Sequence, residues 1–190
     1  MSETKLPDTD ITPEEHYSRP RALVTALLKW LECEFFGLFI CLSVIAMRVV
    51  MHTAADVIFG AAGLVCYIVV LSDFGLKQGA KARVKNQIRG DNVRPIFGFL
   101  LGIVSQLPAA AGLAVFALSS SLPAFKIMNT GLWGIIDLFA PTMRTPDIRP
   151  ALWAVYPLLL VLQAAAVGIC FVMGLNNEDL ATKIIYKKQE

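Results

Sequence analysis

The sequence predicts an all-α polytopic membrane protein, a bundle of four transmembrane helices preceded by an N-terminal amphipathic interfacial helix. Of its 190 residues, 56% are hydrophobic and only 17% are charged, which leaves too few polar side chains to cover a soluble core. Four apolar segments are each about as long as the roughly 20 residues that a helix needs to cross a bilayer. Inside the bilayer, a single segment can satisfy its own backbone hydrogen-bonding groups only as a helix. The four segments lie at about 34–51, 54–73, 95–119 and 151–174.

The chain around these segments divides into three parts. Residues 1–19 are polar and acidic, lack the basic and then apolar design of a cleaved signal peptide, and are expected to form a flexible cytoplasmic N-terminus. Residues 20–174 form the predicted membrane domain, with an outer connection at 120–150. Residues 175–190 are expected to form a cytoplasmic tail.

An interfacial helix is predicted from Ser18 to Leu31, before the first crossing. Pro20 suits a first helical turn, and apolar residues recur at helical spacing opposite polar ones. The apolar face holds Leu23, Leu27, Trp30 and Leu31, and the polar face holds Arg21, Thr25 and Lys29. Such a helix is expected to lie along the membrane surface.

The connection from Gly75 to Arg94 predicts the orientation of the chain. It contains six basic residues against the single acid Asp91, whereas the first turn, around His52 and Thr53, has no Lys or Arg. The positive-inside rule therefore places this connection in the cytoplasm. With four crossings, both termini are then cytoplasmic, and we expect a multi-pass protein of the plasma membrane.

The same basic residues are candidate contacts for anionic lipid headgroups, because each contributes about 1 kcal/mol near a charged membrane surface. They are Lys77, Lys81, Arg83, Lys85, Arg89 and Arg94. Nucleic acid is not an expected partner, since the connection has no aromatic residue on which bases could stack.

An apolar run in the outer connection, from about 126 to 140, is too short to span a bilayer. We favour an interfacial helix with Trp133 at the depth of the headgroups. The alternative is a re-entrant segment that dips into the membrane.

Polar residues within the predicted helices are candidate functional residues, because polar groups in lipid are costly. They are Arg48, Asp56, Ser105, Gln106 and Gln163. Arg48 and Asp56 lie symmetrically about the first turn, so an ion pair is predicted between them. We favour a role in setting the register of this hairpin over a role in an ion or proton pathway.

The two glutamines both fall near mid-membrane on antiparallel helices. A hydrogen bond worth about 1 kcal/mol is expected to join Gln106 and Gln163, and a substrate contact is the alternative. Pro108 and Pro157 remove backbone donors from the same helices and favour kinks. Together with Ser105, these prolines would leave a polar cavity open to the outside, a shape that transporters use.

Small residues predict close helix packing, because they let helix backbones approach one another in lipid. They are Gly60 to Gly63, Gly98 and Gly102 as G-x-x-x-G, Ala109 to Ala111, and Ala164 to Ala166. One such face would also suit another membrane protein subunit. The cysteines Cys33, Cys41, Cys66 and Cys170 are expected to be buried thiols and not disulfides.

The sequence has no pattern typical of catalysis or of cofactor binding. His16 and His52 are far apart, and neither a nucleophile motif nor a phosphate-binding glycine motif occurs. The segment from Asn176 to Asp179 could bind a cation, but Gly174 followed by asparagines more simply ends the last helix. No cofactor and no metal is expected.

Several diffuse features are spread over the C-terminal two thirds of the chain. They are Arg83, Asn86 and Arg94 in the basic connection, Pro108 in the third helix, Asn129 and Trp133 as N-x-x-x-W, Pro157 in the last helix, and Gly174 before the tail Ile184 to Lys188. In this order they resemble a group of small, uncharacterised bacterial four-helix integral membrane proteins of unknown function. The resemblance implies a bacterial plasma membrane and no site residues.

Abundant packing faces and little chemistry lead us to expect a non-catalytic membrane protein that assists, anchors or regulates a larger membrane assembly. The alternative is a small transporter or channel for an ion or small polar solute, motivated by the polar residues beside two prolines. An enzyme is the class that the sequence supports least.

Overall fold

The structure, a computed structural model, describes residues 17–89, 92–141 and 148–176. Among these residues, four helices are long and apolar enough to cross a membrane, and no strand occurs. They are α1 (Arg19–Met51), α2 (Thr53–Arg89), α3 (Ile96–Ser119) and α6 (Leu152–Leu175). Three short helices connect α3 to α6, namely α4 (Leu122–Ile127), the 3-10 helix η1 (Thr130–Leu132) and α5 (Trp133–Phe139). The predicted all-α membrane bundle is therefore confirmed.

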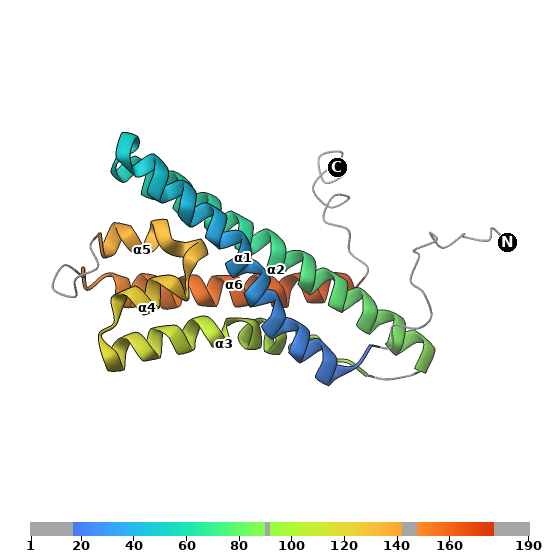
Figure 1. Ribbon diagram of the computed structural model, residues 1–190. Coiled ribbons are helices and arrows are strands. Elements are labelled where there is room, and N and C mark those ends of the chain that lie inside the picture. Colours follow the sequence, from blue (N-terminus) through green and yellow to red (C-terminus); the bar gives the residue numbers. More distant parts are fainter. Residues whose placement is uncertain (1–16, 90–91, 142–147, 177–190) are drawn as a thin grey trace, which may run out of the picture.

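Residues predicted to form a separate interfacial helix are instead the first part of α1, continuous with the first crossing. Pro20 stands in its first turn, as expected, and the helix then runs for 33 residues without a break. At 1.5 Å per residue this is about 50 Å, well beyond a hydrocarbon thickness of about 30 Å. His52, at φ 49°, then reverses the chain into α2. Figure 1 shows α1 and α2 side by side and oblique to the α3–α6 pair.

Helix α2 is also longer than predicted, because most of the basic connection is helical. The predicted end at Asp73 is wrong. Gly75 and Gly79 do not interrupt the helix but bring it against α6, since an added Cβ would lie 2.5 Å from Val167 O and 2.1 Å from Phe171 O. The Lys, Arg, Ala and Gln residues that follow are good helix formers, so the helix continues to Arg89.

The predicted G-x-x-x-G of α3 forms close helix contacts, whereas the predicted small residues Ala61, Ala62, Ala110 and Ala111 are exposed. An added Cβ on Gly102 of α3 would lie 2.2 Å from Ala164 O of α6, and one on Gly98 would lie 2.5 Å from Phe171 Cβ. Helices α1 and α3 begin, and helices α2 and α6 finish, at the same end of the bundle. We call this the basic end. The opposite end, at the His52 turn, is the turn end. Each end has its own apolar core.

The connection between α3 and α6 folds into the bundle and not along its surface. It leaves α3 at the turn end, runs inward as α4, turns at η1 and returns outward as α5 (Figure 1). Three glycines make room for its tip, because an added Cβ on Gly63 would lie 2.0 Å from Gly131 O and one on Gly37 would lie 2.4 Å from Gly131 N. The favoured interfacial helix is therefore wrong, and the re-entrant alternative describes residues 122–139, which we call the re-entrant hairpin.

The cysteines agree largely with prediction. All four are free thiols; Cys33, Cys41 and Cys170 are buried, and Cys66 is half-buried.

Candidate functional site

The re-entrant hairpin completes a cluster of charges at the turn end. Asp137 of α5 accepts hydrogen bonds from Lys126 Nζ of α4 at 2.5 Å and from Arg48 Nη1 of α1 at 2.7 Å. The other guanidinium nitrogen, Nη2 of Arg48, lies 3.4 Å from Asp56 Oδ2 of α2. The predicted ion pair between Arg48 and Asp56 is thus confirmed. We call these four residues the ion cluster.

Burial makes the pairing within the ion cluster important. The side chains of Lys126 and Asp137 are each 1% exposed, that of Asp56 is 2% exposed, and that of Arg48 is 36% exposed. Trp133 Nε1 also donates to Asp137 Oδ2 at 2.9 Å, and Lys126 Nζ donates to Ala140 O at 2.6 Å. Two acids face two bases, so the cluster is formally neutral. An unbalanced charge at this depth would be strongly destabilising.

A second polar group joins the tip of the hairpin to the middle of α1 and α2. Glu34 Oε1 accepts a hydrogen bond from Tyr67 Oη at 2.6 Å, and its Oε2 accepts from Thr130 N and Thr130 Oγ1, both at 2.8 Å. Tyr156 Oη of α6 donates to Asn129 Oδ1. Asn129 Nδ2 donates to Phe125 O at 2.8 Å. Glu34 of α1 and Tyr156 of α6 therefore bind the tip directly, and Tyr67 of α2 holds Glu34 in place.

Sequence reasoning missed Lys126, Asp137 and Glu34. The first two fall in the predicted outer connection at 120–150, within the run expected to be interfacial or re-entrant, and Glu34 is the first residue of the predicted first crossing. Because α1 begins at Arg19, Glu34 instead lies near the middle of a 33-residue helix. The one available signal was that Asn129 and Thr130 interrupt an apolar run, which is typical of a buried turn that needs side-chain partners.

The predicted hydrogen bond between Gln106 and Gln163 is absent. Gln106 Nε2 donates to Ser105 Oγ at 3.2 Å, and Ser105 Oγ donates to Gly102 O at 2.7 Å within α3. Gln163 is fully buried, and neither atom of its amide group has a hydrogen-bond partner. Burying an amide without a hydrogen bond is costly, so Gln163 stays a candidate contact for a polar group inside the bundle.

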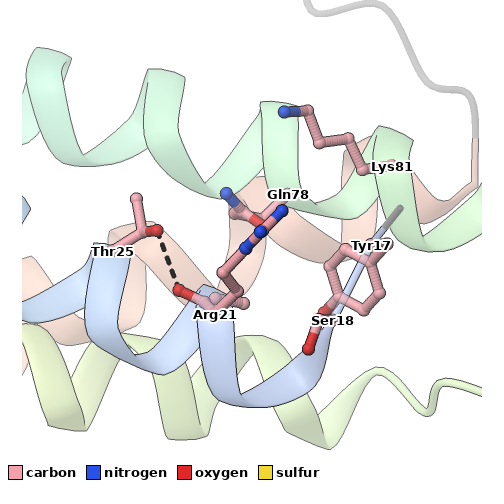
Figure 2. A pocket seen from close by; sticks show the side chains of 7 residues that line it. Tyr17, Ser18, Arg21, Thr25, Gln78 and Lys81 are labelled. Carbon is pink, nitrogen blue, oxygen red and sulfur yellow. Dashed lines mark hydrogen bonds between the residues drawn. The ribbon is translucent and has the colours of Figure 1, made fainter. Parts of the chain in front are cut away.

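Two of the cavities lined by described residues lie at the basic end. One, of about 190 Å³, separates α1 from α2, and Figure 2 shows Arg21 extending from α1 toward Gln78 of α2, with Lys81 beyond it. Its remaining lining includes Tyr17, Ser18, Ala22 and Thr25. The other, of about 580 Å³, lies where α1 and α3 begin. It is lined by Arg19, Asn92, Arg94, Ile96, Phe97 and Leu100.

The predicted headgroup contacts follow α2 and the start of α3. Lys77 pairs with Asp73 at 2.7 Å on an exposed face. Arg94 is exposed, whereas Lys81, Arg83 and Lys85 are half-buried. The side chain of Arg89 lies outside the described residues.

Tyr17 lies under this basic surface. The ammonium group of Lys85 lies 5.9 Å from the centroid of the Tyr17 ring. Burial raises the pKa of the Tyr17 phenol, and the nearby Arg19 guanidinium partly opposes the rise. The phenol therefore stays neutral at physiological pH.

The described residues contain no group of three or more His, Cys, Asp and Glu side chains that could hold a metal ion. His52 stands at the first turn. His16 and the acidic part of the segment from Asn176 to Asp179 lie outside the described residues.

The apolar spans, the bundle and the paired interior charges define a polytopic α-helical membrane protein. Comparison with models of protein families, with characterised proteins and with solved structures found no match for this chain.

Proposed function

We propose that this protein is a non-catalytic integral membrane protein that assists, anchors or regulates a larger membrane assembly. The main support for this proposal is that the buried charged side chains form hydrogen bonds and ion pairs with other residues of the same protein. Asp137 and Lys126 hold one another, and Glu34 holds the tip of the re-entrant hairpin. Neither described cavity is lined by any of these residues. The pairing of these buried groups with one another supports a structural role for them in the bundle.

The exposed face of α2 is further support for a protein partner that binds within the membrane. Ala54, Ala61 and Ala62 are exposed there, beside the exposed Val57 and Val65. Small side chains favour helix association in lipid, because dispersion contacts between closely approaching backbones are the main attraction available. A helix of another membrane subunit is the partner that such a face fits.

Site-specific photo-crosslinking in native membranes tests this function. A photoreactive residue in place of Ala62 is expected to yield one discrete protein adduct of reproducible mass, identified by mass spectrometry. The matched control replaces Ile103, which is 57% exposed on α3, and is expected to crosslink lipid. If both positions crosslink only lipid and the purified protein is strictly monomeric, the proposal fails.

A small transporter or channel is the second candidate, and Gln163 is the observation that favours it. Its buried, unpartnered amide would suit a polar solute or an ion with its water. Flux into proteoliposomes separates the two functions. If solutes cross only with the protein present, and Gln163→Leu abolishes this flux while the bundle remains folded, the accessory function is wrong.

A bacterial plasma membrane, with the basic end and both termini in the cytoplasm, completes the proposal. The basic side chains of α2 and the arginines at the starts of α1 and α3 support it, since cytoplasmic segments are enriched in Lys and Arg.

Cysteine accessibility provides the check on orientation. In a chain whose own four cysteines are replaced, Thr53→Cys at the turn end is expected to react with an impermeant maleimide outside intact cells. Gln87→Cys, exposed at the basic end, is expected to react only after permeabilisation. The reverse pattern would contradict this orientation.

A further inference from the structure

The cavity at the starts of α1 and α3 combines a cationic part with an apolar part. Arg19 and Arg94 are both exposed, and Arg19 Nη2 donates to Asn92 O at 3.4 Å, which links the start of α1 to the segment before α3. Neither arginine forms an ion pair within the part of the chain that the structure describes. Ile96 and Leu100, which are 73% and 44% exposed, follow on α3.

The cationic part and the apolar part of the cavity correspond to the headgroup layer and the hydrocarbon layer of a bilayer. Two apolar spans, α1 and α3, begin at its rim. Ile96 and Leu100 are four residues apart and so lie on one face of α3, directed along the first turns of a membrane span. Phe97, which also lines the cavity, packs edge-to-face on Tyr17, with ring centroids 6.5 Å apart. This contact holds the Phe97 side of the cavity in place. In a bilayer that α3 spans from Ile96, the charges of Arg19 and Arg94 would lie at headgroup depth, next to this apolar track.

We propose that this cavity binds one anionic phospholipid. Guanidinium groups bind phosphate through paired hydrogen bonds, and Arg19 and Arg94 offer two of them to one phosphodiester. The exposed side chains of Ile96 and Leu100 receive the first part of an acyl chain. The apolar track favours a lipid over a free phosphate, which would leave Ile96 and Leu100 without a partner. This inference is independent of whether the protein is an accessory subunit or a transporter.

Native mass spectrometry of the full-length protein from detergent micelles tests the site. Phosphatidylglycerol is the anionic probe, and phosphatidylcholine of equal chain length is the zwitterionic one. The wild type is expected to retain one phosphatidylglycerol. The double variant Arg19→Gln/Arg94→Gln is expected to bind it about thirtyfold more weakly, from the usual attraction of two basic residues to an anionic headgroup. Arg149→Gln removes one charge from an exposed residue at the turn end and is expected to bind as the wild type does.

Three results would overturn the proposal. An equal loss in Arg149→Gln would mean that net charge and not the cavity governs binding. Equal retention of phosphatidylcholine would mean that the arginines do not recognise the headgroup charge. Displacement of the lipid by inorganic phosphate, in the wild type and not in the double variant, would assign the cavity to a free anion. If the double variant does not fold, Arg94→Gln alone is used, with an expected loss of about fivefold.

Discussion

Replacing Lys126 with methionine is expected to lower the free energy of unfolding by about 3 to 5 kcal/mol, the usual cost of removing one partner from a buried ion pair. The variant leaves Asp137 and Asp56 facing the single cation of Arg48, so one negative charge remains uncompensated at side chains that are 1% and 2% exposed. It also leaves Ala140 O without its donor. Unfolding in detergent micelles, followed by circular dichroism, measures the loss.

Two controls test whether the loss of stability comes from the uncompensated charge: a double substitution within the ion cluster, and a substitution in an exposed ion pair. Lys126→Met/Asp137→Asn removes one charge of each sign, leaves Arg48 opposite Asp56, and is expected to recover much of the lost stability. Lys77→Met breaks the exposed pair with Asp73 and is expected to cost at most about 1 kcal/mol. Equal effects of Lys126→Met and Lys77→Met would show that the ion cluster does not stabilise the fold.

Replacing Gly63 with alanine is expected to destabilise the bundle by about 1 to 3 kcal/mol, the usual cost of overpacking. The added Cβ would lie 2.0 Å from Gly131 O, a backbone atom at the tip of the re-entrant hairpin. That atom cannot move alone, because the adjacent Thr130 is bonded to Glu34 and Gly131 also lies against Gly37. The melting temperature of the variant in detergent is expected to fall accordingly.

Gly112 of α3 is the matched control for this prediction. An added Cβ there meets nothing closer than Asn129 Nδ2, at 3.3 Å, and then the side chain of Met128. The side chain of Asn129 must give by only a few tenths of an ångström, and the about 1 kcal/mol by which a helix favours alanine over glycine offsets this, so Gly112→Ala is expected to cost clearly less than Gly63→Ala. If Gly63→Ala and Gly112→Ala behave alike, the hairpin does not pack as closely as described.

Local features were predictable from the sequence. The ends of the first and third crossings at Met51 and Ser119 were predicted at those residues, because an apolar run and the polar residue that stops it are neighbours in the chain. The pair of Arg48 and Asp56 was predictable for the same reason, since a tight turn lies between them. The end of α2 was not predictable, because basic residues that favour a helix also occur in loops, and the sequence pattern does not distinguish the two.

The candidate site depended on contacts between distant segments. Thr130 and Glu34 are 96 residues apart, and Arg48 and Asp137 are 89 residues apart. The hydrogen bond predicted between Gln106 and Gln163 is absent, because the position of a residue along a helix does not specify which face its side chain occupies.

By itself, the sequence determined the all-α class, the four apolar spans and the small residues on which the helices pack. These follow from composition and from a periodicity that operates within single helices. Only the tertiary structure decided that residues 122–139 enter the bundle, and so that Lys126, Asp137 and Glu34 are buried. The length of an apolar run that is too short to span a bilayer does not distinguish a segment on the membrane surface from one buried in the protein. The glycine contacts among Gly37, Gly63 and Gly131, which select the second, exist only when α1 and α2 are already side by side.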